Sequence, residues 1–276
     1  KSRVPFVNFF DGFRTSHEYQ KIEVMDQEDI RPLVPMDKVS EFRNRALTPE
    51  HPVARGMAEN PETFFAHREV CNSYYEAVPA IVEKYMAEIS KITGREYKLF
   101  SYYGADDADR VIICMGSVTE AAREAIDYLN AQGQKVGMIS VHLYRPFSVK
   151  HLLAAVPKTC KKIAVLDRTK EPGASGEPLY LDVKDAFYNE AERPVIVGGR
   201  YGLGSCDTTP TMIISVYDNL ALPEPKDHFT VGIVDDVTFT SLPLEAEKAL
   251  GGEGIFEAKF YGLGADGTVG ANKNSV

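Results

Sequence analysis

Residues 110–133 read RVIICMGSVTEAAREAIDYLNAQG, and this stretch decides the fold. Its opening run, 110–117, is short and apolar, which is typical of a strand buried on both faces of a sheet. Ser117 and Glu120 have the spacing of a capping box, which starts helices. The apolar residues that follow share one helical face until Gly133 stops the helix; they are Ala122, Ala125, Ile126 and Leu129. The stretch predicts a buried strand followed directly by a helix.

The same unit recurs along the chain. Further strands are predicted over 135–143, 162–167 and 194–199. Further helices are predicted over 148–156 and 178–191, and another begins with Thr209 as its cap and Pro210 at its first position. Strand–helix pairs in sequence predict right-handed crossovers and a parallel sheet covered on both faces. We therefore expect an α/β fold, a doubly wound parallel sheet over about 96–222, flanked by partial α/β domains.

The segments on either side have different patterns. A helical stretch is predicted from Asn60 to Gly94, bent or divided at Pro79, after an extended loop over 45–61. Near the amino end, Thr15 and Glu18 have the spacing of a second capping box. Beyond the central domain, 222–227 has the composition of a linker and 228–236 that of a strand. We expect a new domain to begin there.

Composition excludes several classes of protein. The chain is 44% hydrophobic and 26% charged, with no apolar run near the roughly 20 residues of a membrane span. A net charge of −9 and the absence of a basic run argue against nucleic acid as a partner. The four cysteines are far apart and form no C-x-x-C, so neither a structural metal nor a disulfide framework is expected. A reducing cytoplasm fits this pattern.

Charged residues follow the predicted strands, where ligands bind in parallel sheets. They are Arg145, Asp167, Arg168, Lys170, Glu171 and Arg200. A ligand site and a set of salt bridges that fix loops or dock domains both stay open, and the second is favoured because domain rims are commonly charged. The glycine clusters at 173–176 and 198–204 favour tight turns over phosphate binding. Asp11, Arg14, His17 and Glu18 form a polar turn in which no catalytic triad is expected.

Residues 260–276 read FYGLGADGTVGANKNSV and contain G-x-G-x-x-G at Gly262, Gly264 and Gly267. The run 255–261 before it is compatible with a strand, and residues after it carry groups that bond phosphate oxygens or amides: Thr268, Asn272, Lys273, Asn274 and Ser275. Anion binding and a purely structural turn both stay open. The bare pattern is weak, because too few residues follow for an acidic ribose partner.

Several segments together resemble one family of enzymes. They are FFDGFRTSHE, NPETFFAHRE, YYGADDADRVIICMGSV, VGMISVHLYRPFS, AVLDRTKEPGASGEPLYLDV, GGRYGLGS and FYGLGADGTVGANKNS. In this order they are similar to pyruvate:ferredoxin (flavodoxin) oxidoreductases, over nearly the whole chain. The family's polypeptide is several times longer, so the resemblance implies an internal section. It implies the tail of a thiamine-pyrimidine-type domain at 1–60, a helical connector at 61–95, a transketolase C-terminal-like domain at 96–222, and the start of a coenzyme A-associated, gamma-type domain at 223–276.

The resemblance also implies a reaction, with its cofactors and partners. The family decarboxylates pyruvate oxidatively with coenzyme A, giving acetyl-CoA and CO2, and passes electrons through iron-sulfur clusters to ferredoxin or flavodoxin. Thiamine diphosphate, Mg and the clusters are expected to be held by other domains of a parent enzyme, which is expected to be a homodimer. The chain lacks the G-D-G…N magnesium signature and cysteine-rich runs. We expect the section alone to be inactive.

Only the glycine loop carries over to a binding role. Gly264 and Gly267 would allow close approach, and Thr268, Asn272 and Lys273 would contact a phosphate or amide of coenzyme A. No catalytic or metal-binding residue is assigned, and Arg55 is given no role. Two alternatives remain: a non-catalytic domain-docking module, and a nicotinamide-dependent dehydrogenase. The dehydrogenase is disfavoured because the glycine loop does not open a Rossmann unit.

Overall fold

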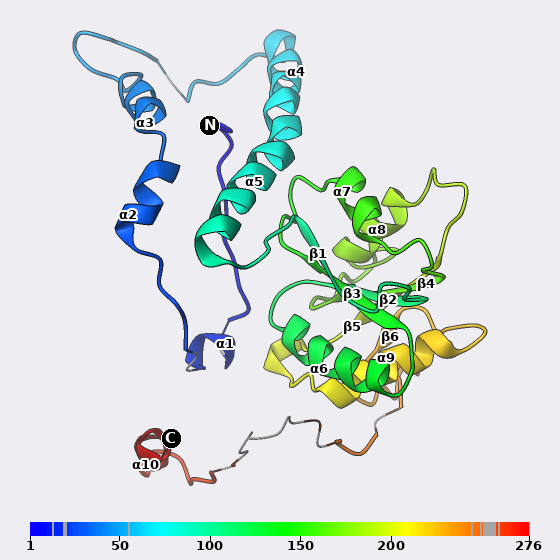
Figure 1. Ribbon diagram of the computed structural model, residues 1–276. Coiled ribbons are helices and arrows are strands. Elements are labelled where there is room, and N and C mark those ends of the chain that lie inside the picture. Colours follow the sequence, from blue (N-terminus) through cyan, green and yellow to red (C-terminus); the bar gives the residue numbers. More distant parts are fainter. Residues whose placement is uncertain are drawn as a thin grey trace.

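The computed structural model describes the chain except residues 13, 19, 20, 55, 244, 249, 251–257, 259 and 276. At its centre is a six-stranded sheet in the order β1-β3-β2-β4-β5-β6 (Figure 1). The strands are β1 Phe100–Gly104, β2 Arg110–Cys114, β3 Val136–Val141, β4 Lys162–Asp167, β5 Val195–Arg200 and β6 Phe229–Thr230. All neighbouring pairs are parallel except β1 and β3, which are antiparallel. The predicted doubly wound parallel sheet is confirmed, with an antiparallel edge strand added.

Helices cover both faces of this sheet, as Figure 1 shows. On one face lie α6 Val118–Ala131 and α9 Pro210–Ala221, which contact each other and the central strands. On the other lie α7 Val149–Ala155 and α8 Pro178–Ala186. Each face has its own core of buried apolar residues. Strand β3 is buried along its whole length and β2 along most of it, which explains why their sequences read as continuous apolar runs.

The starts of these helices only partly follow the predicted caps. Thr209 caps α9 as predicted, its side-chain oxygen accepting a hydrogen bond from the Met212 N–H at 3.3 Å. The capping box predicted at Ser117 is wrong, because Ser117 has helical backbone angles and its side chain makes no cap hydrogen bond. The box predicted at Thr15 is also wrong, since Thr15 lies inside the short helix α1 Arg14–His17.

Ahead of the sheet, the described residues are helical or irregular. The helices are α1, α2 Gln27–Ile30, the 3-10 helix η1 Arg31–Leu33, α3 Met36–Arg43, α4 Pro61–Val70 and α5 Asn72–Thr93. The predicted helical stretch does begin at Pro61 and end at Gly94, whose φ of 70° is left-handed. Its predicted division at Pro79 is wrong, because the break falls at Cys71 and Pro79 lies inside α5. Neighbouring Val78 is fully buried, so packing there offsets the hydrogen bond that proline cannot donate.

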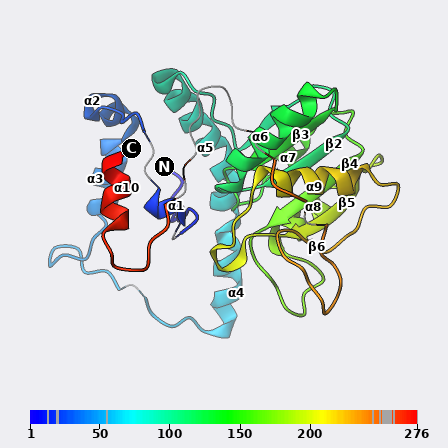
Figure 2. The same ribbon diagram turned by 90° about the horizontal axis from the view of Figure 1, so that it is seen from below.

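After α9 the chain returns to the same sheet. The strand predicted over 228–236 is reduced to β6, which pairs with β5 and therefore extends the central sheet. The domain boundary at 222 stays a prediction. A 3-10 helix η2, Leu203–Ser205, precedes α9, and α10 Thr268–Ser275 follows the glycine loop away from the sheet (Figure 2). Most of the strand predicted over 255–261 lies outside the described residues.

Candidate functional site

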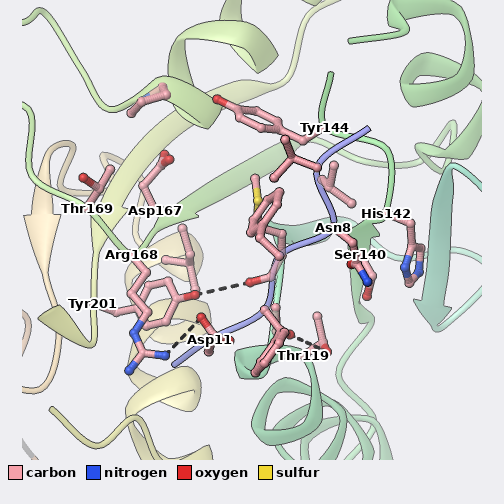
Figure 3. Close-up of a pocket in the computed structure, with 18 residues that line it drawn as sticks. Asn8, Asp11, Thr119, Ser140, His142, Tyr144, Asp167, Arg168, Thr169 and Tyr201 are labelled. Atoms are coloured by element: carbon pink, nitrogen blue, oxygen red, sulfur yellow. Dashed lines mark hydrogen bonds and ion pairs between the residues drawn. The ribbon is translucent and has the colours of Figure 1, made fainter. Parts of the chain in front are cut away.

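The candidate site is a cavity of about 560 Å³ at the carboxyl ends of the central strands. Residues that directly follow β2, β3, β4 and β5 line it, including Met115, His142, Arg168 and Tyr201. A further wall is formed by residues 7–11, an extended segment that we call the strap. Figure 3 shows the strap crossing the cavity, with Ser140 and His142 on one side and Asp167 and Arg168 on the other. The strand ends are where parallel sheets place ligands, as the sequence predicts.

Asp11 fastens the strap to the sheet. One of its carboxylate oxygens, Oδ2, accepts a hydrogen bond from the backbone N–H of Ser117, at the start of α6. The other, Oδ1, lies 3.1 Å from Arg168 Nη1, just after β4 (Figure 3). Burial alone would raise the pKa of Asp11, but hydrogen bonds from Ser117 and the positive charge of Arg168 outweigh it and hold the pKa below its ordinary value. The Asp11 side chain is therefore an ionised carboxylate at neutral pH.

The partners of Asp11 are themselves fixed by the loop after β5. Arg168 Nε donates a hydrogen bond to the carbonyl of Gly202 at 2.9 Å. Gly202 has a φ of 64°, in the left-handed region that favours glycine, which turns its carbonyl toward the arginine. Tyr201, buried beside them, donates from its hydroxyl to the carbonyl of Met115 at 3.4 Å. Loops from three strand ends thus meet around one carboxylate.

The other charged residues of the predicted rim have structural partners. Asp167 accepts hydrogen bonds at 3.0 Å from the backbone N–H groups of Leu179 and Tyr180, in the first turn of α8. Burial raises the pKa of Asp167, although these hydrogen bonds oppose the shift. Arg200 forms an ion pair with the buried Glu177, and Arg145 forms one with Asp182. These contacts hold loops in place, which is the interpretation that the sequence favoured.

Two further rim residues lie outside the main cavity. Lys170 lines a second hollow beside the strap, together with residues 202–205. Glu171 lies in the loop after β4, where its carbonyl accepts the Ala174 N–H at 3.2 Å. The glycine prediction for 198–204 is only partly right. Gly198 and Gly199 lie inside β5, and the turn glycines are Gly202 and Gly204, both with positive φ.

Polar groups without a formal charge at neutral pH surround the rest of the cavity. Burial, with a smaller contribution from Arg123, lowers the pKa of His142, so this imidazole is neutral at pH 7. Burial raises the pKa of Tyr144 to about 12, and the Arg145 guanidinium stacks on its ring at 3.9 Å from the centroid. With Ser140, Thr119 and Thr169 these groups can donate and accept hydrogen bonds. They supply no nucleophile activated by a neighbouring base.

The predicted coenzyme-binding residues lie elsewhere. Gly264 and Gly267 have positive φ and lead into α10, which begins at Thr268 and contains Asn272 and Lys273. Asp266 already engages two donors of this loop, since its carboxylate accepts the N–H groups of Leu263 at 2.8 Å and Thr268 at 3.0 Å. A third hydrogen bond comes from the Thr268 hydroxyl. This bond has the largest effect on Asp266 and, together with the two from N–H groups, lowers its pKa to about 2. The structure does not bring this loop to the main cavity.

Sequence reasoning missed the role of the strap. Asp11 was recognised as part of a polar turn, but nothing local shows that it meets Ser117, 106 residues away. His17 and Glu18 of the same turn are exposed and lie outside the cavity. His142 and Ser140 had a usable signal, because they stand at the end of a predicted buried strand.

No group of three or more His, Cys, Asp or Glu side chains in the described part of the chain is placed to hold a metal ion. Among the same residues, no helix combines the length and the apolar character needed to cross a bilayer.

Comparison with known proteins gives consistent matches along the chain. Residues 1–87 match the family described as pyruvate flavodoxin/ferredoxin oxidoreductase, thiamine diP-bdg. Residues 108–213 match pyruvate:ferredoxin oxidoreductase core domain II. The chain is 61% identical over 277 residues to a pyruvate-flavodoxin oxidoreductase of Enterobacter agglomerans, covering 100% of this chain and 24% of that protein. It is 55% identical over 276 residues to a pyruvate:ferredoxin oxidoreductase of Moorella thermoacetica, with the same coverage.

A solved structure is similar at a lower level. It is a 2-oxoglutarate:ferredoxin oxidoreductase from Magnetococcus marinus, with a TM-score of 0.39 and 21% identity over 62% of this chain and 27% of that chain. This similarity is too weak to carry an argument. The sequence matches show more: the chain spans 24% of the length of the curated relatives named above, so it corresponds to a section of them, as the resemblance predicted.

Proposed function

Since this chain belongs to the family of pyruvate:ferredoxin and pyruvate-flavodoxin oxidoreductases, we propose that it joins the thiamine-diphosphate-binding region of such an enzyme to core domain II. The enzyme would decarboxylate pyruvate oxidatively with coenzyme A, giving acetyl-CoA and CO2, and pass electrons to ferredoxin or flavodoxin. One observation supports this joining role of the chain. The strap, from the first matched region, forms a wall of the cavity in the second.

The residues present do not fit the diphosphate end of thiamine diphosphate. That end requires a magnesium ion with oxygen ligands, and the described residues hold no suitable cluster of acids. The arginine of the cavity, Arg168, already pairs with Asp11. The four cysteines are likewise separate, and Cys114 is buried. We therefore place Mg and the iron-sulfur clusters on other parts of the parent enzyme and assign no chemical step to this chain.

The glycine loop is proposed as support for coenzyme A. Gly264 and Gly267 have positive φ, which suits a turn around an anion, and the loop opens α10, whose N-terminus favours an anion. Thr268, Asn272 and Lys273 would supply the hydroxyl, the amide and the positive charge. Asp266 competes for the same donors, so the loop would bind a phosphate only where Asp266 gives way.

The test of the coenzyme loop compares two lysine variants of the full-length enzyme. Lys273→Ala should raise the apparent KM for coenzyme A and leave that for pyruvate unchanged. The control is Lys91→Ala, on the connector helix α5, which should change neither constant. An unchanged constant for coenzyme A in Lys273→Ala would remove this loop from the proposal while leaving the rest intact.

The test of the activity uses the full-length enzyme as it is purified, with its cofactors. We expect reduction of methyl viologen that requires both pyruvate and coenzyme A and forms acetyl-CoA. The same assay with 2-oxoglutarate in place of pyruvate should give a much lower rate. Absence of pyruvate-dependent reduction, or a preference for 2-oxoglutarate, would contradict the proposal. The elution mass of the same sample tests the proposed homodimer.

A second candidate function is favoured by the site itself. The charged rim is used in ion pairs and helix caps, which suits a non-catalytic domain-docking module. Calorimetry on the 276-residue chain distinguishes the two roles. Binding of coenzyme A would support a coenzyme-binding contribution, whereas its absence would leave docking as the function of the chain within the enzyme.

A further inference from the structure

The strap lies across the crevice of the doubly wound sheet. From β2 the chain crosses to β3 on one side, and it later returns to β4 on the other, so the order of strands reverses between β2 and β4. The loops that leave β2 and β4 diverge at such a point and open a crevice in which doubly wound proteins bind their ligands. In this chain the side chain of Asp11 lies in that crevice, where it contacts Arg168 on one side (Figure 3) and the backbone N–H of Ser117 on the other.

The contacts of Asp11 are those of a bound carboxylate. Each oxygen has a different partner, one the N–H of Ser117 at the start of α6 and the other the guanidinium of Arg168. Helix α6 has 14 residues, and the positive end of its dipole adds to the charge of Arg168. Arg168 is held from behind by the Gly202 carbonyl, so the cation keeps its position.

The crevice is also shaped for this ligand. A Cβ atom on Gly116 would lie 2.6 Å from Asp11 Oδ2, so only glycine lets the carboxylate approach the helix start. The carboxylate is planar and uses one oxygen for each of the two sides of the crevice. The site therefore accommodates a carboxylate, with one oxygen on each side.

Apolar burial does not hold the strap. Phe9 and Phe10 are 63% and 71% exposed, and Val7 is 84% exposed. The Asp11 side chain, by contrast, is 16% exposed. Fixing an extended segment costs about 1–2 kcal/mol per residue in backbone entropy, so specific contacts must offset that cost. Among the described contacts of the strap, those of Asp11 are the charged ones.

We propose that Ser117, Arg168 and Gly116 form a carboxylate-binding site whose resident ligand is Asp11 of the same chain. Asp11 fills the ligand crevice of the central domain and thereby fastens the strap over the cavity. We call this set of contacts the latch. Without the Asp11 side chain, the site accepts a small free monocarboxylate such as formate or acetate. This inference stands on the contacts alone and is independent of the proposed function.

The test is whether a free carboxylate restores the stability of a variant of the purified full-length enzyme that lacks the Asp11 side chain. Asp11→Ala should lower the thermal midpoint by roughly 3–6 °C. Sodium acetate or formate should restore at least half of that loss, whereas sodium chloride at equal ionic strength should not. The wild type and Asp29→Ala, an exposed aspartate on α2, should gain no more from acetate than from chloride. Equal effects of acetate and chloride on Asp11→Ala would overturn the proposal.

A second readout keeps the test decisive if Asp11→Ala folds poorly. Asp11→Asn retains an oxygen for the Ser117 N–H but lacks the charge that pairs with Arg168. Chymotrypsin cleavage at Phe9 and Phe10 should be severalfold faster in Asp11→Asn than in the wild type, because the strap is released. Arg168→Gln should accelerate cleavage in the same way, and acetate should not slow it, since the cation is absent. Unchanged cleavage in both variants would show that the latch does not hold the strap.

Discussion

Arg200 Nη1 lies 3.4 Å from Glu177 Oε1, and the two side chains are only 11% and 3% exposed. Glu177 is also the residue before α8, and Arg200 ends β5, so the pair joins the start of a helix to the carboxyl end of a strand. Arg200 donates a second hydrogen bond to the carbonyl of His228 at 3.0 Å, which ties the segment before β6 to the same point.

Removing one member of this pair should be costly, because it leaves a buried charge without its partner. We expect Arg200→Met to lower the free energy of unfolding by about 3 kcal/mol. The double variant Arg200→Met with Glu177→Gln should recover part of that loss. Urea unfolding measures both, with Arg193→Met, at an exposed position, as the control. A loss below about 1 kcal/mol would mean that the pair behaves like an exposed one.

Two buried tyrosines allow a matched comparison of hydroxyl contacts. Tyr217 donates to the Gly137 carbonyl at 2.9 Å and is fully buried, whereas the Tyr201 contact with Met115 is longer, at 3.4 Å. Tyr217→Phe leaves a buried acceptor short of a donor and should cost about 1–2 kcal/mol. Tyr201→Phe should cost less. Equal losses in chemical denaturation would contradict this ranking.

A methyl group added inside β5 should not be tolerated. A Cβ atom on Gly199 would lie 2.2 Å from ring atoms of Phe229, which is fully buried. We expect Gly199→Ala to cost about 1–3 kcal/mol. The control is Gly270→Ala in α10, where nothing lies within 4 Å, and alanine there should not lower the thermal midpoint. Phe229→Leu should relieve part of the defect in Gly199→Ala.

The latch should respond to acid in a defined direction. The pKa of Asp11 is lower in the folded state than its ordinary value of 3.8, so folding favours the ionised form. Its contribution to stability is complete well above that pKa and is lost as the pH falls below it toward the folded-state pKa. The difference in thermal midpoint between wild type and Asp11→Asn should therefore be constant from pH 5 to 8 and shrink below about pH 4. A difference that grows on acidification would contradict this assignment.

The sequence was sufficient for the parts of the fold that depend on local pattern. The apolar run over 110–117 and the periodic helix after it predicted β2 and α6 to within three residues. A strand buried on both faces is a continuous apolar run in the sequence, so it can be predicted without knowing what packs against it. Thr209 and Pro210 marked the start of α9 for an equally local reason, since cap chemistry lies within four residues.

The misses share a different cause, which is contact between distant segments. Ser117 has a capping-box neighbour in sequence, but its N–H is taken by Asp11 and its own side chain makes no cap hydrogen bond. Pro79 is an ordinary helix breaker, yet buried packing beside it keeps α5 intact. The two-residue strand β6 owes its place to pairing with β5. None of these outcomes is visible in a short window of sequence.

The separation of the latch residues has a consequence for the order of folding. The hydrogen bond from Ser117 to Asp11 spans 106 residues, and closing so long a loop carries a large entropic cost. The two groups that bind Asp11, Arg168 and the start of α6, come into position only once β2 and β4 are paired. We therefore expect the strap to dock last, onto a finished sheet, so that a mutation at Asp11 speeds unfolding and leaves the refolding rate of the sheet unchanged.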